Sequence, residues 1–191
     1  MPRDRPPAKR PDRERRAVPP LDAAGLERLA LRYVERFATT RGKLADYLRR
    51  KARERGWDGV ADPAALAGEL AERLASLGYI DDRGYAEAKA TSLARRGMGA
   101  RRVAGALMQA RVGEADREAV APGVADRALE AALAFARRKR LGPWARDEAT
   151  PDRAVRDKQV AAMLRAGHPL DLARRIVALP PGEVPDSADL A

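Results

Sequence analysis

The feature that most constrains the fold of this chain is a helical period that persists, with clear punctuation, through most of its length. In the first periodic segment, apolar residues recur at three- and four-residue intervals and so share one face of a helix. They are Leu26, Leu29, Ala30, Tyr33, Val34 and Phe37. Alanine, which loses no side-chain entropy in a helix, supplies 41 of the 191 residues, whereas β-branched residues are too sparse to build a sheet. The sequence therefore predicts an all-α protein.

Turn residues divide this period into successive helices. A second helix carries the apolar residues of 44–48. Around the third, Asp62 can cap the start, Pro63 takes the first helical position and Gly78 follows the end. Apolar residues 66, 70, 74 and 77 form its stripe, and Asp81 or Asp82 can cap the next helix. The expected remainder is a helix after Gly99, a short helix over 116–120 inside a stretched loop of residues 113–124, and helices over 125–141, 152–166 and 169–179.

Three apolar pairs with the same spacing indicate an internal repeat. The pairs are Leu44 with Leu48, Val103 with Leu107 and Val160 with Leu164. Their first members lie 59 (103 minus 44) and 57 (160 minus 103) residues apart. Small helical repeats bury their apolar faces against their neighbours. We therefore expect a curved, elongated stack of three tandem three-helix repeats over residues 21–80, 81–124 and 125–179.

Both ends of the chain depart from the helical pattern. Residues 1–20 contain six prolines, seven basic and three acidic side chains, giving a segment charge of +4. Such a segment buries too little apolar area to offset its ordering entropy, so we expect a disordered, basic, proline-rich leader. It either holds the protein near a polyanion or is an unconstrained tail. Residues 180–191 are expected to form a flexible acidic tail.

Several classes of protein are excluded or disfavoured. The chain has no cysteine, so disulfides, thiolate catalysis and cysteine-ligated metals are excluded. Its longest run without a charged residue, 103–110, is far shorter than the ~18 residues of a membrane span. No apolar segment follows the basic N-terminus, as a secretory signal would require. We expect a monomeric protein of the cytoplasm with no membrane association.

Catalytic signals are weak. His168, the one histidine, lies between Gly167 and Pro169 at a helix junction, where capping or packing is favoured over general-base catalysis because no nucleophile is implied nearby. The segment from Gly97 to Gly99 lacks a preceding strand, and Arg102 replaces the third glycine of a dinucleotide loop.

Two further pairs have structural alternatives. Asp81 and Asp82 resemble an acid or metal pair, but helix capping explains them. Trp57 and Trp144 fall at helix ends, where anchoring neighbouring helices is favoured over base stacking. The sequence therefore predicts no enzyme activity, no cofactor and no metal.

Basic clusters are the remaining candidates for function. Each lies at or near a helix end, where a cation can interact with the helix dipole, so a structural explanation is available. The clusters also recur in every expected repeat, so that in a regular stack they could line one face and bind phosphates or an acidic protein surface. Both interpretations stay open. The candidate partner-binding residues are Arg49, Arg50, Lys51, Arg95, Arg96, Arg101, Arg102, Arg137, Arg138, Lys139 and Arg140.

Several short segments in a fixed order carry a resemblance to a known family. The central one reads LGYIDD over residues 77–82 and continues with Tyr85, Ala86, Gly97, Gly99, Arg101, Arg102, Val103, Leu107 and Val112. Others read LRYV over 31–34, RKRLGP over 138–143, LRAG over 164–167 and LARRIV over 172–177. Together they resemble the RecX family, bacterial regulators of the RecA recombinase. The chain departs from the family pattern at His168, where an aromatic is usual, and in its leader and the 113–124 loop.

The resemblance implies a fold and a function. Members of the family are curved stacks of three-helix repeats that bind along the groove of the RecA filament and limit strand exchange, ATP hydrolysis and co-protease activity. Some also bind DNA. By this resemblance the chain is a non-enzymatic regulator of RecA filaments in DNA repair, recombination and the SOS response. The alternative is a basic helical protein that binds single- or double-stranded nucleic acid independently of RecA, with an affinity that falls steeply as salt rises.

Overall fold

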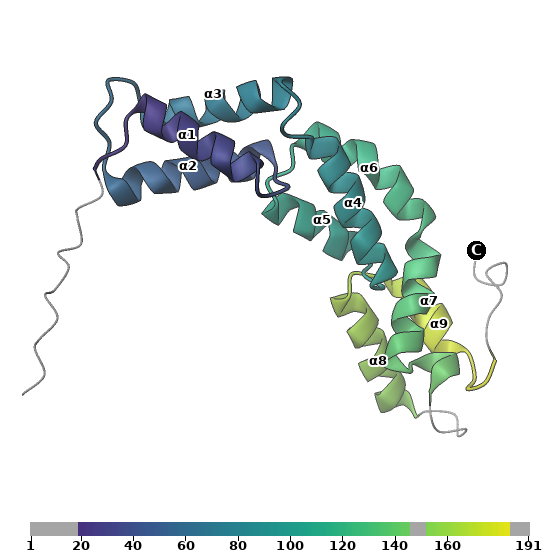
Figure 1. Ribbon diagram of the computed structural model, residues 1–191. Coiled ribbons are helices and arrows are strands. Elements are labelled where there is room, and N and C mark those ends of the chain that lie inside the picture. Colours follow the sequence, from purple (N-terminus) through teal and green to yellow (C-terminus); the bar gives the residue numbers. More distant parts are fainter. Residues whose placement is uncertain (1–18, 146–151, 184–191) are drawn as a thin grey trace, which may run out of the picture.

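The computed structural model describes residues 19–145 and 152–183. The expected leader and most of the expected tail lie outside these residues. The described part of the chain is all-α and contains no strand, which confirms the expected class (Figure 1). Its helices are α1 (Ala23–Val34), α2 (Arg41–Arg55), α3 (Pro63–Ser76), α4 (Asp82–Arg95), α5 (Ala100–Gln109), α6 (Glu114–Asp126), α7 (Ala128–Lys139), the 3-10 turn η1 (Gly142–Trp144), α8 (Arg153–Arg165) and α9 (Leu170–Ala178).

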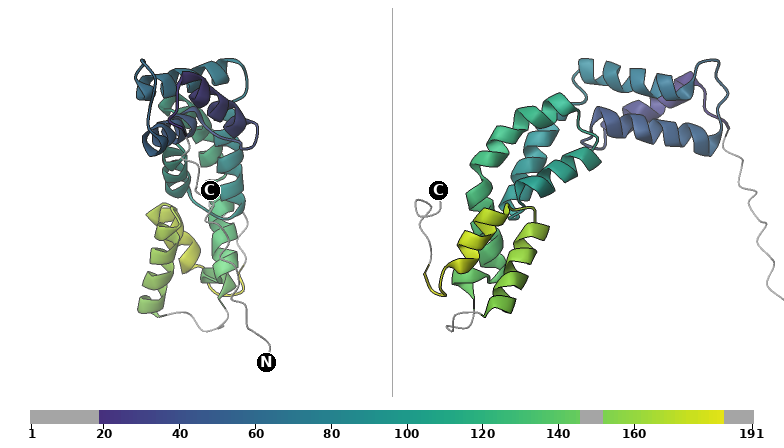
Figure 2. Two further views of the ribbon diagram at one scale, coloured as in Figure 1. Left: turned by 60° about the vertical axis from the view of Figure 1, so that its left-hand side comes forward. Right: turned by 180° about the vertical axis from the view of Figure 1, so that it is seen from behind.

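The helices lie in three successive groups, each with its own core. Helices α1 to α3 pack on one another, α4 to α6 form the middle group, and α7 to α9 form the last. The three groups follow one another along a bent rod (Figures 1 and 2). Alanines such as Ala30, Ala90 and Ala132 are fully or almost fully buried in the three cores. Their small side chains let neighbouring helices approach closely, so three thin cores replace one thick core.

Several expected boundary signals are confirmed. The Asp62 side chain accepts hydrogen bonds from the N–H groups of Ala64 (3.2 Å) and Ala65 (3.0 Å), and Pro63 begins α3. Asp81 caps α4 by accepting from the Gly84 N–H at 2.8 Å. These bonds satisfy N–H groups that have no partner inside the helix.

The two tryptophans anchor helices, as expected. The Trp57 indole donates to the Ala61 carbonyl at 2.8 Å and packs against the first core. Trp144 packs against the third core.

The expected loop over 113–124 and short helix over 116–120 are wrong. Helix α6 runs from Glu114 to Asp126 and passes straight through Pro122. A proline removes one backbone donor and disturbs the carbonyls of the preceding turn. Here Arg83 supplies another donor to that turn, at 3.2 Å from the Ala119 carbonyl, and Val120 is buried against the middle core. Tertiary packing therefore keeps the helix intact, and α7 begins at Ala128 instead of residue 125.

Two members of the expected apolar stripes are exposed. Phe37 is 54% exposed and Leu77 is 64% exposed. Helix α1 ends at Val34, and Leu77 is the residue that ends α3, so neither side chain continues the buried face of its helix.

Candidate partner-binding groove

The basic residues expected on α2 are paired with acidic neighbours. Arg49 contacts Asp46 at 3.4 Å, Arg50 contacts Glu54 at 3.5 Å, and Lys51 contacts Glu54 at 2.7 Å. The hydrogen bond from Lys51 lowers the pKa of the Glu54 carboxyl. Each of the three cations thus has a carboxylate partner on its own helix.

The basic residues at the end of α7 have structural roles. Arg138 donates to the Arg96 carbonyl, and its guanidinium lies over the Phe135 ring at 5.6 Å from the centroid. Arg137 and Lys139 occupy the last turn, where a cation interacts favourably with the helix dipole. Arg140 ends the helix in the left-handed conformation, with φ at 57°.

A groove between α4, α5 and α8 gathers cations of a different kind. It has a volume of about 830 Å³, and none of the residues that line it carries a carboxylate. Its five cations project from three helices and the residue that ends α4, and within the described part of the chain their side chains form no hydrogen bond or ion pair. We call this surface the basic groove. Its cations are Lys89, Arg96, Arg101, Arg102 and Arg165.

The basic groove brings together three of the candidates from the sequence and adds two. Arg96, Arg101 and Arg102 were expected, whereas Lys89 and Arg165 were missed because each is isolated from other basic residues. Lys89 lies seven residues before Arg96 and so on the same side of α4, a spacing that could have revealed it. Arg95 lines a separate hollow that also contains Glu87.

Close backbone contact between α5 and α8 forms one end of the basic groove. The Gly99 N–H donates to the Ala166 carbonyl at 2.9 Å, and the Arg101 N–H donates to the Gly167 carbonyl at 3.3 Å. A Cβ atom on Gly99 would overlap the backbone of Gly167, so only glycine permits this approach. The Gly97–Gly99 segment is therefore a helix junction, and it sets Arg165 into the same groove as the cations of α5.

His168 packs beneath this junction, as expected. It is 4% exposed, its Nε2 lies 3.1 Å from the Gly97 carbonyl, and its ring lies 5.6 Å from that of Phe135. Because a carbonyl can only accept, Nε2 carries the proton. Burial lowers the pKa of the imidazole, and the bond to Gly97 opposes that shift.

The helix dipole does not explain the cations of α5. Arg101 and Arg102 lie in the first turn of the helix, which holds no acidic residue. The N-terminal end of a helix carries partial positive charge and disfavours cations. The expectation that every basic cluster interacts favourably with a helix end is wrong here. Two exposed arginines and a helix N-terminus instead reinforce one positive potential, which suits an anionic partner.

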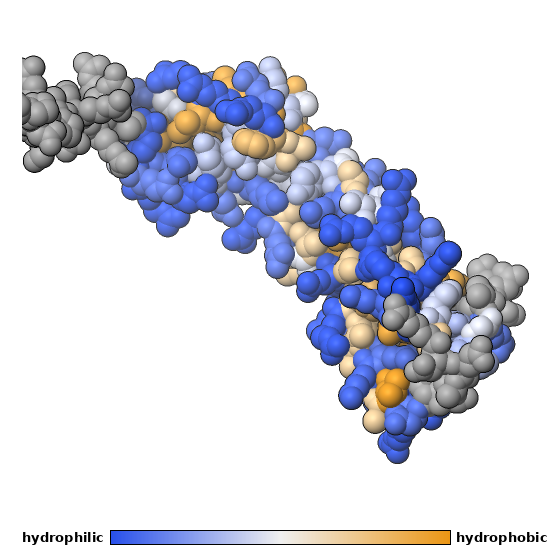
Figure 3. Space-filling view, turned by 60° about the horizontal axis from the view of Figure 1, so that its bottom comes forward, coloured by the Kyte–Doolittle hydropathy of each residue, from blue (hydrophilic) through white to orange (hydrophobic). Residues whose placement is uncertain are grey.

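The floor of the basic groove is apolar. Leu93 and Met98 are partly buried, and Leu164 is 39% exposed although it lies one residue after the fully buried Met163. The surface of the molecule shows pale orange patches between hydrophilic areas along its length (Figure 3). A ligand of the basic groove therefore meets apolar side chains as well as positive charge.

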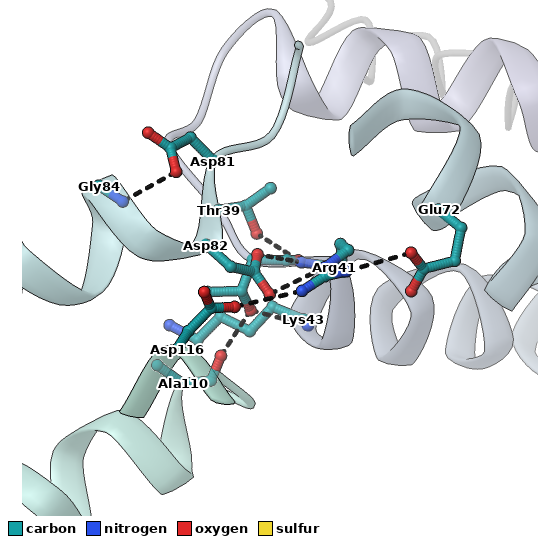
Figure 4. A network of polar contacts seen from close by, with 10 residues as sticks. Thr39, Arg41, Lys43, Glu72, Asp81, Asp82, Gly84, Ala110 and Asp116 are labelled. Atoms are coloured by element: carbon teal, nitrogen blue, oxygen red, sulfur yellow. Dashed lines mark hydrogen bonds and ion pairs between the residues drawn. The ribbon is translucent and has the colours of Figure 1, made fainter. Parts of the chain in front are cut away.

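A second polar cluster ties the first helix group to the middle one (Figure 4). Arg41 lies among three carboxylates, contacting Asp82 at 3.1 Å, Glu72 at 3.2 Å and Asp116 at 3.2 Å. Helix capping therefore accounts for Asp81 but not for Asp82, which is buried and binds a residue 41 positions earlier. This corrects the expectation that capping explains both aspartates.

Neither a metal site nor a membrane span emerges from the described residues. They include no group of three or more acidic, histidine or cysteine side chains placed to hold a metal ion. None of their helices has the length and apolar character needed to cross a bilayer.

Comparisons with known proteins find two curated relatives. The chain is 35% identical over 160 residues to a protein of Myxococcus xanthus named Regulatory protein RecX, covering 80% of this chain and 83% of that protein. It is 33% identical over 159 residues to a protein of Agrobacterium fabrum with the same name, covering 82% and 84% respectively. No family model matches the chain.

Proposed function

The chain belongs to the RecX family of regulatory proteins, and from this premise we propose that it is a non-enzymatic regulator that binds filaments of the RecA recombinase. By binding, it limits strand exchange, ATP hydrolysis and co-protease activity, and so modulates DNA repair, recombination and the SOS response. It acts in the cytoplasm as a monomer and needs no cofactor.

The basic groove is the observation that carries this proposal. Its five cations have no partner in the described part of the chain, unlike the paired cations of α2. Exposed charges without a structural role are available for a partner. They lie on helices of the middle and last groups, and the molecule is elongated, which suits contact with more than one subunit of a polymer (Figure 2). Several weak contacts along a filament then add up to a strong one.

We further propose that the three helix groups are copies of one unit, with the boundaries 21–80, 81–124 and 125–179 expected from the sequence, except that the second unit extends to the end of α6 at Asp126. Leu44 and Leu48 are fully buried in the first core, and Val103 and Leu107 are almost fully buried in the middle one. In α8 the buried residue is Met163, and Leu164 is turned outward. The third unit therefore departs from the pattern at Leu164, which leaves an apolar side chain in the basic groove.

A titration of ATP hydrolysis by the cognate recombinase on single-stranded DNA tests the function. Added protein is expected to suppress hydrolysis at or below one molecule per recombinase subunit and to co-sediment with the filaments. An unchanged rate of hydrolysis, together with the absence of the protein from the filament pellet, would contradict the proposal.

The five cations also favour a second function, binding of nucleic acid without the recombinase. That function predicts tight binding to DNA or RNA alone, with an affinity that falls linearly with salt on logarithmic axes. Fluorescence anisotropy with labelled oligonucleotides at several salt concentrations checks it. An affinity that does not change with salt would count against it.

A further inference from the structure

We propose that the basic groove binds an acidic protein segment that also carries apolar side chains. The inference rests on the proposed function and deepens it, because it assigns the contact to the recombinase protein and not to the DNA that the recombinase coats. It draws on the charge of the groove, its apolar floor and the absence of aromatic residues from its lining.

Charge complementarity identifies the sign of the ligand. The lining holds five cations and no carboxylate, and two of the cations lie in the first turn of a helix that adds its own positive field. Rows of carboxylates and rows of phosphates both satisfy this condition. Charge alone therefore leaves a protein segment and a nucleic acid as candidates.

The apolar floor separates these two candidates. Leu93, Met98 and Leu164 line the groove together with the cations, and Leu164 is 39% exposed, so apolar surface is available to a ligand there. A sugar–phosphate backbone offers them only the C–H groups of its sugars, between charged phosphates. A helix or extended segment with leucine or methionine among its acidic residues would bury this floor, and its carboxylates would pair with the cations of the groove. Methionine, being flexible and polarisable, is well suited to such an adaptable contact.

Single-stranded nucleic acid would need a different lining. Proteins that bind single strands stack the bases on aromatic side chains. None of the residues that line the basic groove is aromatic. The bases would find no aromatic platform, so a single strand would gain only its phosphate contacts and stacking on arginine side chains.

Fluorescence anisotropy with defined probes and the full chain tests the inference. The first probe is a helix-forming peptide of about 16 residues with glutamates and with leucines at helical spacing. The second has serine in place of every leucine and the same charge. The third is duplex DNA of about 16 base pairs. The inference expects the leucine peptide to bind at least about tenfold more tightly than the serine peptide.

Variants of the protein separate the contribution of the apolar floor to binding from that of the cations. Leu164→Gln should weaken binding to the leucine peptide and to the recombinase filament at least about fivefold, because it removes an apolar contact. Binding to the duplex should be unchanged, because the cations are kept. The double variant Arg101→Glu with Arg102→Glu should weaken every anionic probe. The matched control is Arg32→Glu with Arg36→Glu, which makes the same change of charge at exposed residues of the first helix group and should leave the peptides unaffected. Circular dichroism and thermal melting confirm that each variant is folded.

Two results of the binding measurements would overturn the inference. One is equal binding of the leucine and serine peptides. The other is binding of the duplex that depends on Arg101 and Arg102, together with peptide binding that Leu164→Gln leaves unchanged. This result would assign the groove to nucleic acid. If Leu164→Gln suppresses ATP hydrolysis as well as the wild type does, the inference fails and the proposed function stands. If the wild type neither suppresses hydrolysis nor co-sediments, the proposed function fails, and the peptides still decide what chemistry the groove accepts.

Discussion

Arg41 binds the carboxylate of Asp82 through two different groups. Its backbone N–H donates to Oδ1 at 2.9 Å, and its Nε donates to Oδ2 at 3.1 Å. The side chain of Asp82 is only 4% exposed, so the ion pair is largely shielded from water on that side. The hydrogen bond to Asp82 raises the pKa of Arg41. Because Arg41 begins α2 and Asp82 begins α4, this contact fixes the first helix group against the middle one.

Removing the buried carboxylate should therefore loosen that connection. We expect Asp82→Ala to lower the free energy of unfolding by about 2 to 3 kcal/mol, because the buried end of α2 loses its acceptors while Arg41 keeps partial contact with solvent. Urea denaturation monitored by circular dichroism measures the change. Asp46→Ala removes an exposed carboxylate that also contacts two arginines, and should change stability by less than about 1 kcal/mol. Equal effects of the two substitutions would show that burial of Asp82 adds nothing.

At the junction between the middle and last groups, Gly99 should not tolerate a side chain. Gly99→Ala would place a methyl group against the backbone of Gly167, so we expect a loss of about 2 kcal/mol or more in the free energy of unfolding. Gly105 lies in the interior of the same helix with open space around it. There, alanine should raise stability by up to about 1 kcal/mol, because it is the better helix former. A Gly99→Ala protein as stable as the wild type would contradict the close approach of α5 and α8.

Local signals in the sequence predicted most helices but not their partners. Asp62, Pro63 and Gly78 lie within one helix and its ends, so their roles could be read from spacing. The predicted helix end at Pro122 is wrong, because packing of α6 on α4 overrides the local preference of proline for a helix end.

The candidate site needed contacts that a sequence does not contain. Arg49 and Arg101 look alike in the sequence, because each belongs to a short run of basic residues at or near a helix end. Only the fold reveals that Arg49 has Asp46 as a partner while Arg101 shares a carboxylate-free groove with Arg165, 64 residues (165 minus 101) further along the chain. The outward turn of Leu164 is equally hidden, because burial of Met163 in its place depends on how α8 packs against the last core.

Burial of the one histidine predicts a pH dependence of stability. Burial lowers the pKa of His168 in the folded protein, whereas in the unfolded chain the imidazole takes up a proton near its ordinary pKa of about 6.5. The unfolded state therefore binds more protons as the pH falls below that value, and stability falls with it until the folded state is protonated as well. In the His168→Gln variant this contribution is absent.

A comparison of the wild type with His168→Gln isolates the titration of this imidazole, because the chain holds no other histidine. We expect the free energy of unfolding of the wild type to fall more between about pH 7.5 and about pH 5.5 than that of His168→Gln. Denaturant titrations of both proteins at the two pH values measure the difference, and the carboxylates that titrate in the same range are common to both. Parallel losses would show that His168 is as accessible to protons in the folded protein as in the unfolded chain.

Reversal of the two arginines at the start of α5 should separate binding from stability. Glutamate is favoured in the first turn of a helix, where arginine is disfavoured, so Arg101→Glu with Arg102→Glu should leave the free energy of unfolding unchanged or raise it by up to about 1 kcal/mol. The same change replaces two of the five cations of the basic groove by anions. Binding to the recombinase filament should then fall at least about tenfold in a co-sedimentation assay. Arg49→Glu with Arg50→Glu makes an equal change of charge at residues already paired with acids and should weaken binding much less. If both double variants lose binding equally, the partner responds to net charge, and the position of the cations in the basic groove is immaterial.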